Sequence, residues 1–139
     1  MNGWNLFYKS FVTKGGYKVV LDGLLTTVEI AVIGLLIGIA IGTLLAVAKV
    51  IPKYKVFPKV LSVIADAYVG LFRGTPMVVQ LLVGYFVLLP ALKIRADATV
   101  VAIVIFGMNS GAYVCEIMRS GINSVDKGQL EAGRAVGLS

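Results

Sequence analysis

The sequence contains no histidine and a single cysteine, Cys115. Without histidine there can be no histidine-based catalytic triad, no His-Glu-x-x-His zinc site and no histidine acid/base catalysis. One cysteine excludes an intrachain disulfide and a multi-cysteine metal site. The Gly-x-x-x-x-Gly-Lys-[Ser/Thr] loop that holds nucleotide phosphates is also missing. We therefore expect no catalytic residue, no metal and no bound cofactor in this chain.

Charged residues are also scarce, at 14% of the chain, whereas apolar residues make up 58% and the mean hydropathy is +0.92. Soluble domains usually carry about a quarter charged residues. The basic residues that give the net charge of +6 lie between apolar runs and not along one polar face. This distribution indicates the positive loop ends of membrane helices and not a nucleic-acid surface.

The first apolar run, Leu24 to Ala48, predicts a membrane span. A helix of this length would be about 37 Å long, enough to cross a hydrocarbon core of about 30 Å. Gly34, Gly38 and Gly42 share one face of it, where the missing side chains would let another helix approach closely. Upstream, aromatic residues at helical spacing predict a short helix at the membrane surface: Trp4, Phe7, Tyr8 and Phe11.

Two further spans are predicted, over residues 76–92 and 98–118. The short second span follows a helix with a narrow polar stripe, which lies in the interface or faces a partner or cavity. The stripe consists of Lys59, Ser62, Asp66, Gly70 and Arg73. Arg73, Gly74, Thr75 and Pro76 should break this helix, with Thr75 as the N-cap of the next helix and Pro76 at its first position.

The third span carries polar residues on one face, because Asn109, Tyr113, Glu116 and Ser120 are spaced by three or four residues. Such a face should avoid lipid. Asn109 and Tyr113 are candidates for a translocation pathway or for hydrogen bonds between helices. Glu116 lies one turn from Arg119, which favours either a structural ion pair or a gating role.

The positive residues that flank the spans predict the orientation. Eight fall on one side and five on the other, which places the N-terminus outside and the C-terminus in the cytoplasm. The larger group is Lys49, Lys53, Lys55, Lys59, Arg73, Arg119, Lys127 and Arg134; the smaller is Lys9, Lys14, Lys18, Lys93 and Arg95. Residues 120–139 then form a cytoplasmic tail, with a short helix from about Gln129 to Val136 that ends at Gly137.

This tail resembles the EAA loop of binding-protein-dependent ABC importer permeases, whose pattern is Glu-Ala-Ala, three residues and Gly. Glu131, Ala132 and Gly137 match, and Gly133 takes the place of the second Ala. Three other segments resemble the polar amino acid uptake subfamily of these permeases: Gly23 to Thr27, Phe72 to Pro76, and Tyr113 to Ile122. The resemblance covers about residues 15–139.

The resemblance implies an all-α, polytopic membrane helical bundle of about five spans. The 139 residues would be a partial, C-terminally truncated transmembrane domain with three of them. It implies a multi-pass protein of the bacterial inner membrane, a permease subunit of an ATP-driven importer for polar or charged amino acids. The expected partners are ABC ATPase subunits that bind the ATP, a second permease subunit, identical or homologous, and an extracytoplasmic solute-binding protein. Glu131, Ala132, Gly133 and Gly137 would form a coupling helix in a cleft of the ATPase.

Two other classes of protein fit parts of the sequence. A fragment of an ion-coupled carrier would use Glu29 or Glu116 as its coupling acid, but it would need no docking site for an ATPase, so the tail argues against it. A membrane scaffold protein would give no transport phenotype.

Overall fold

The computed structural model describes residues 3–51, 54 and 56–137, and the regular structure in them is helical throughout. The helices follow one another along the chain in the order α1 (Gly3–Tyr8), η1 (Lys9–Thr13), α2 (Gly16–Val50), α3 (Val56–Gly74), α4 (Met77–Val83), η2 (Gly84–Leu88), α5 (Leu89–Ala91), α6 (Ala98–Asn123) and α7 (Lys127–Ala135). The two η elements are single π-helical stretches. The prediction of an all-α membrane protein is confirmed.

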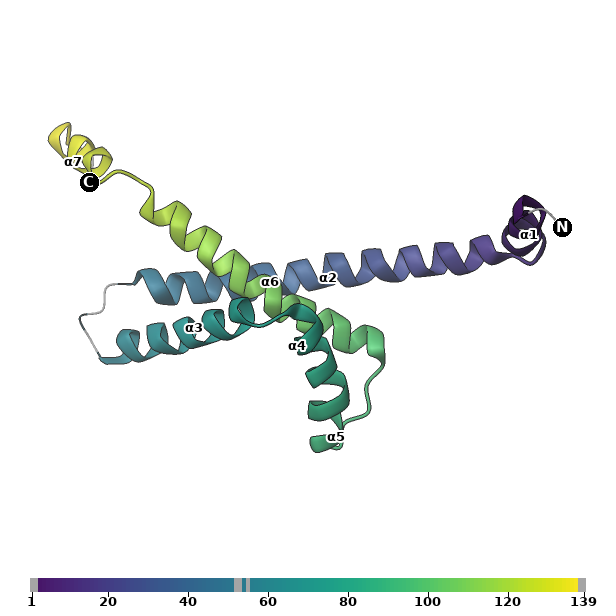
Figure 1. The fold of residues 1–139 in the computed structure, drawn as a ribbon. Coiled ribbons are helices and arrows are strands. Elements are labelled where there is room, and N and C mark those ends of the chain that lie inside the picture. Colours follow the sequence, from purple (N-terminus) through teal and green to yellow (C-terminus); the bar gives the residue numbers. More distant parts are fainter. Residues whose placement is uncertain (1–2, 52–53, 55, 138–139) are drawn as a thin grey trace.

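Two helices, α2 and α6, are long and apolar enough to cross a membrane. They contain the predicted spans 24–48 and 98–118 and extend beyond them. They run parallel, since Gly34, Gly38 and Gly42 contact Phe106, Ser110 and Val114 in that order. Figure 1 shows α6 crossing α2, with α7 at the far end of α6 and α1 at the far end of α2.

Between these two helices the chain returns through a broken segment. Helix α3 is followed by the run from Met77 to Ala91, and the two arms are bent by 103° at residues 75–76. Together the arms are apolar enough to form a third span, either broken or re-entrant. In Figure 1, α3 lies beside the C-terminal half of α2, and the second arm turns away from it. The predicted span 76–92 therefore corresponds to the second arm alone.

The contact between α2 and α6 is the largest in the structure, and it is built on small residues of both helices. A Cβ atom added to Gly38 would lie 2.5 Å from Cβ of Ser110, and one added to Gly42 would lie 2.6 Å from Cβ of Val114. Glycines of α6 pack against α2 in the same way: a Cβ added to Gly107 would lie 2.7 Å from the Ile37 side chain. Real Cβ atoms do not approach so closely, so these glycines set the distance between the helices.

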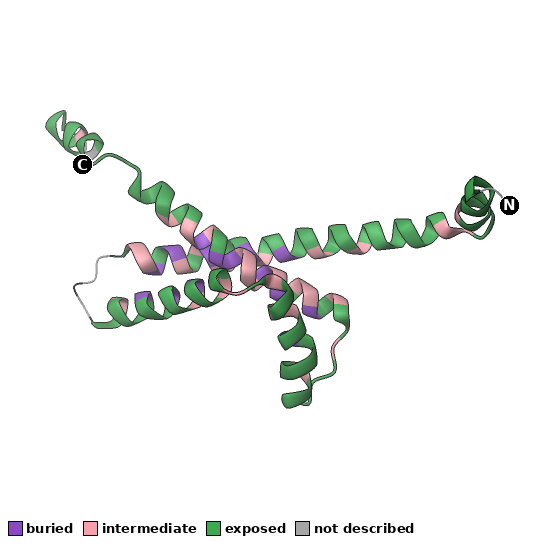
Figure 2. Ribbon diagram, viewed as in Figure 1, coloured by how far each residue is buried: buried purple, intermediate pink, exposed green. Residues whose placement is uncertain are grey.

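Few large side chains are buried. The described core consists of Ala46, Val69, Ala112 and Cys115, with Leu45, Tyr68 and Phe72 packed against it. Figure 2 shows most of the buried residues around the crossing of α2, α3 and α6, while most of each helix is exposed. Val101 of α6 and Gly84 of η2 are buried away from this crossing. Apolar surface of this extent suits lipid or other protein subunits and not water.

At the N-terminus, α1 and η1 stack three of the predicted aromatic residues. The ring centroids of Trp4 and Phe7 lie 5.8 Å apart, and those of Phe7 and Phe11 lie 5.2 Å apart. The rings therefore share one face of the helix, as their spacing predicts. Their location at a membrane surface stays a prediction.

The glycine contact leads to a first prediction. Replacing Gly38 by Leu should separate α2 from α6, because the added side chain would have to occupy the position of the Ser110 Cβ. Overpacking of this kind costs about 1–3 kcal/mol. The thermal midpoint in detergent should fall clearly. Gly23→Leu, on the same helix, is the matched control, since a Cβ there meets nothing within 4 Å. Equal midpoints for the two variants would show that the contact tolerates bulk.

Candidate translocation and coupling site

The break between α3 and α4 is held together by side chains that reach the exposed backbone at the end of α3. The Thr75 hydroxyl donates a hydrogen bond to the Leu71 carbonyl at 2.8 Å. The Gln80 amide nitrogen lies 2.9 Å from the Phe72 carbonyl oxygen and 2.8 Å from the Thr75 hydroxyl oxygen. A helix end in an apolar environment needs such partners for its unpaired carbonyls. Gln80 is therefore a structural anchor of the bend.

This arrangement differs from the predicted cap. Thr75 bonds back to α3 and does not cap α4; Pro76, in extended conformation, is the N-cap, and α4 begins at Met77. The physical reason is that the Thr75 hydroxyl finds an acceptor four residues earlier, as threonine often does near a helix C-terminus. Gly74, the last residue of α3, has open space around its Cβ position.

Asn109 of α6 joins this bend. Its amide nitrogen donates to the Gln80 side-chain oxygen at 3.1 Å and lies 3.3 Å from the Phe72 carbonyl oxygen. Nearby, the Tyr68 hydroxyl donates to the Met108 carbonyl at 2.6 Å. The polar middle of α6 is thus bonded to both arms of the broken segment. Of the two roles expected for Asn109, these contacts support hydrogen bonding between helices.

About two turns further along α6, Glu116 forms the centre of a charge cluster. Its Oε1 accepts a hydrogen bond from the ammonium group of Lys49 on α2. Its Oε2 accepts from Arg119 Nη2 at 2.8 Å, and Nη1 of Arg73 on α3 lies 3.9 Å from the same oxygen. The Glu116 side chain is only 16% exposed. Three cations offset the cost of placing this carboxylate among the helices.

The predicted pairing of Glu116 with Arg119 is therefore present, and residues of α2 and α3 join it that the spacing along α6 could not reveal. Lys49 and Asp66 come from α2 and α3, and Lys49 Nζ lies 2.8 Å from Asp66 Oδ1. From the sequence, Lys49 is predicted only as a positive residue at the end of a span, and Asp66 only as part of the polar stripe. The pairing between them depends on the fold.

Tyr113 connects the charge cluster to the bend. The guanidinium carbon of Arg73 lies 5.4 Å from the centroid of the Tyr113 ring, within the range of a cation–π contact. The Tyr113 side chain remains 47% exposed. Asn109, Tyr113, Glu116 and Arg119 therefore form one continuous polar face on α6, with Arg73 beside it.

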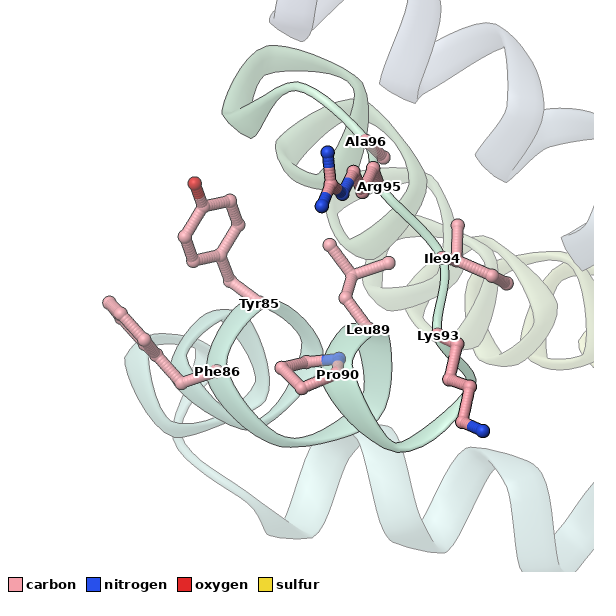
Figure 3. Close-up of a pocket in the computed structure, with 8 residues that line it drawn as sticks. All are labelled: Tyr85, Phe86, Leu89, Pro90, Lys93, Ile94, Arg95 and Ala96. Carbon is pink, nitrogen blue, oxygen red and sulfur yellow. The ribbon is translucent and has the colours of Figure 1, made fainter.

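A cavity of about 470 Å³ opens beside this face. It is lined by Lys49, Ser62, Asp66, Val69, Gly70, Arg73, Glu116 and Arg119. Four residues of the predicted polar stripe on α3 line it, which answers the question of what that stripe faces. A second hollow, of about 600 Å³, lies at the turn between α5 and α6 (Figure 3). Tyr85 and Leu89 line that hollow together with Lys93 and Arg95.

Three of the coupling residues predicted in the tail, Glu131, Ala132 and Gly133, lie on α7, which stands apart from the bundle (Figure 1). The Asp126 side chain caps this helix by accepting a hydrogen bond from the Gly128 N–H at 2.9 Å. Glu131 and Ala132 are exposed, and Gly133 is half-buried. Gly137 follows the helix end with φ of +83°, a left-handed conformation that glycine adopts without strain. The described helix begins two residues before the predicted one.

Comparison with known proteins places the chain among transport permeases. Residues 34–139 match the family described as "Binding-protein-dependent transport system inner membrane component". The arginine transport system permease protein ArtQ of Bacillus subtilis is 43% identical over 119 residues, which cover 86% of this chain and 52% of that protein. The glutamine transport system permease protein GlnP of Escherichia coli is 38% identical over 120 residues, again 86% of this chain and 52% of that protein.

A solved structure agrees in fold. The chain superimposes on a protein described as "Crystal structure of an amino acid ABC transporter with histidines" with a TM-score of 0.77 and 32% identity, over 93% of this chain and 58% of that one. The chain spans about half the length of the curated relatives it matches. On the match over residues 34–139, this chain belongs to the family of inner membrane components of binding-protein-dependent transport systems.

Proposed function

We propose that this chain is part of the permease subunit of an ATP-driven ABC importer for polar or charged amino acids. One observation carries the proposal. Helix α6 presents a polar face that lines the cavity, and the short capped helix α7 follows it and projects from the bundle. The first feature suits a pathway for a polar solute, and the second suits docking on a partner protein.

The same geometry suggests how the parts would work. Tyr113, Glu116, Arg119 and Arg73 would line or gate the pathway, while Asn109 would hold α6 against the bend. Glu131, Ala132, Gly133 and Gly137 would insert α7 into a cleft of the ATPase. The exposure of Glu131, Ala132 and Gly137 supports this role. The small size of Ala132, Gly133 and Gly137 also supports it, because a bulky helix face could not approach a partner's backbone closely.

The further partners would be a second permease subunit and an extracytoplasmic solute-binding protein. The family description, which specifies binding-protein-dependent transport, supports the solute-binding protein. The relatives' names, which specify arginine and glutamine transport systems, support a polar or charged amino acid as the substrate. The unpaired apolar surface of α2, α3 and α6 would be covered by lipid and by the second subunit.

An ion-coupled carrier is not favoured. A coupling acid must bind and release its ion in each cycle, but Glu116 is held by Lys49 and Arg119. Glu29, the other candidate, lies on an exposed face of α2 away from the cavity.

The proposed function is tested by expressing the permease gene with its neighbouring ATPase and binding-protein genes and reconstituting the complex in proteoliposomes. Uptake of polar amino acids should require both ATP and the binding protein. Uptake that follows an imposed proton or sodium gradient in the absence of ATP would support the carrier instead.

The orientation can be tested with single cysteines in a Cys115→Ser background. Lys53 and Lys55, which contribute to the positive-inside count, lie outside the described residues, so Tyr54, whose side chain is 94% exposed, is the better position. A cysteine at position 54 should resist impermeant thiol reagents in intact cells, and one at the exposed Arg95 should react. The reverse pattern would place α7 on the wrong side for an ATPase.

Docking of α7 can be tested at Gly137. Leu at this position adds volume and forces a side chain into the left-handed conformation, at a cost of about 1–2 kcal/mol. Gly137→Leu should insert in the membrane normally but lose most ATPase binding and uptake. Gly137→Asn is the matched variant, because asparagine tolerates this conformation. Partial activity of Gly137→Asn would show how much of the loss in Gly137→Leu comes from backbone strain and how much from the added volume. Full uptake by the Leu variant would exclude α7 as the coupling helix.

A further inference from the structure

Lys49 lies where three helices meet. It is in the last turn of α2, and its ammonium group contacts Asp66 of α3 at 2.8 Å and Glu116 of α6. Its side chain is only 10% exposed. A single group thus bonds to carboxylates on two different helices, so that a shift of either helix relative to α2 must stretch one of these bonds.

The two carboxylates depend on Lys49 to different degrees. Glu116 keeps Arg119, whose Nε and Nη2 donate further hydrogen bonds to it from the same helix. Asp66 is 56% exposed, and Lys49 is the partner that the described ion pairs give it. Loss of Lys49 would therefore leave Glu116 neutralised and Asp66 solvated, so the bundle should still fold. What would disappear is the connection between α3 and the other two helices.

The position of this connection along α3 matters. The C-terminal part of α3 is bonded to α6 through Tyr68 and through the Phe72 carbonyl. The N-terminal part packs the small side chains of Ser62 and Ala65, which are 2% and 0% exposed. Packing of this kind is not directional and permits sliding. The Lys49–Asp66 pair is the directional contact that fixes this part of α3.

Helix α6 connects the charge cluster to α7. Its middle is fixed against α2 by the glycine contact, whereas residues 120–126, between the charge cluster and α7, are exposed. A displacement of α7 would therefore turn the end of α6 about the glycine contact and move Glu116. The force would reach α3 through Lys49.

We propose that Lys49 is a positioning residue that makes the ends of α2, α3 and α6 move together when α7 is displaced. The proposal rests on the importer function above and adds a role that neither the spacing of the EAA-like residues nor the polar face of α6 predicts. Lys49 touches no substrate in this role; it determines whether movement at α7 reaches the helix that lines the cavity.

The test compares Lys49→Met with Lys59→Met in the reconstituted transporter. Both variants lose one positive charge and keep a long apolar side chain, but Lys59 is exposed and lies outside the charge cluster. In Lys49→Met, amino acids transported per ATP hydrolysed should fall by roughly 3- to 30-fold. Binding to the ATPase should be unchanged. Lys49→Arg, which keeps the charge, should recover most of the ratio, and Lys59→Met should match the wild type.

Hydrogen exchange on the same complexes tests the connection directly. Amide exchange in residues 56–66 of α3 should become several-fold faster in Lys49→Met and stay at the wild-type rate in Lys59→Met. Asp66→Asn removes the negative charge of the pair and weakens it to a contact with a neutral amide, so it should reproduce both effects in part. This variant keeps the proposal falsifiable if Lys49→Met does not assemble.

The possible results distinguish a failure of the Lys49 proposal from a failure of the importer function. A wild-type transport ratio in Lys49→Met and Asp66→Asn would overturn the proposal, even if exchange in α3 became faster. Unchanged exchange in both variants would also overturn it, because Lys49 would then not hold α3. A wild-type complex that hydrolyses ATP without moving amino acids would overturn the importer function, and the coupling role of Lys49 with it.

Discussion

The close approach of α2 and α6 is the constraint on which the other contacts depend. Water and lipid give little preference for one apolar helix face over another, so the absence of side chains at Gly34, Gly38 and Gly42 selects this face. Once the backbones are this close, the register between the two helices is fixed. That register brings Glu116 within reach of Lys49 and leaves Glu116 and Arg119 lining the cavity.

The bend between α3 and α4 shows a second consequence of the membrane environment. A turn of 103° exposes carbonyl groups that water would normally solvate. Here Thr75, Gln80 and Asn109 replace the water. The side chains that stabilise the bend also attach α6 to it, so the polar face of α6 is oriented by the same hydrogen bonds that make the broken helix possible.

Residue periodicity was sufficient to predict the features that belong to a single helix. It found the glycine face of α2, the polar face of α6 and the pairing of Glu116 with Arg119, while the Gly-Thr-Pro run after Arg73 predicted the break. Contacts between helices could not be predicted in this way, because the Lys49–Asp66–Glu116 arrangement depends on how α2, α3 and α6 are placed in space. The role of Gln80 was also missed, although a single amide within an apolar run was a usable signal. Thr75 was assigned to the wrong helix because its hydroxyl can either accept a hydrogen bond from an N–H of the following helix or donate one to a carbonyl of the preceding helix.

The parallel arrangement of α2 and α6 has a consequence for assembly of the protein. Gly34 contacts Phe106, more than seventy residues later in the chain, and everything between them must first cross back over the bilayer. During synthesis, α2 therefore enters the membrane before its partner exists, with its glycine face turned toward lipid. The contact that defines the folded bundle forms late, and until then the early helix depends on its apolar surface alone to stay in place.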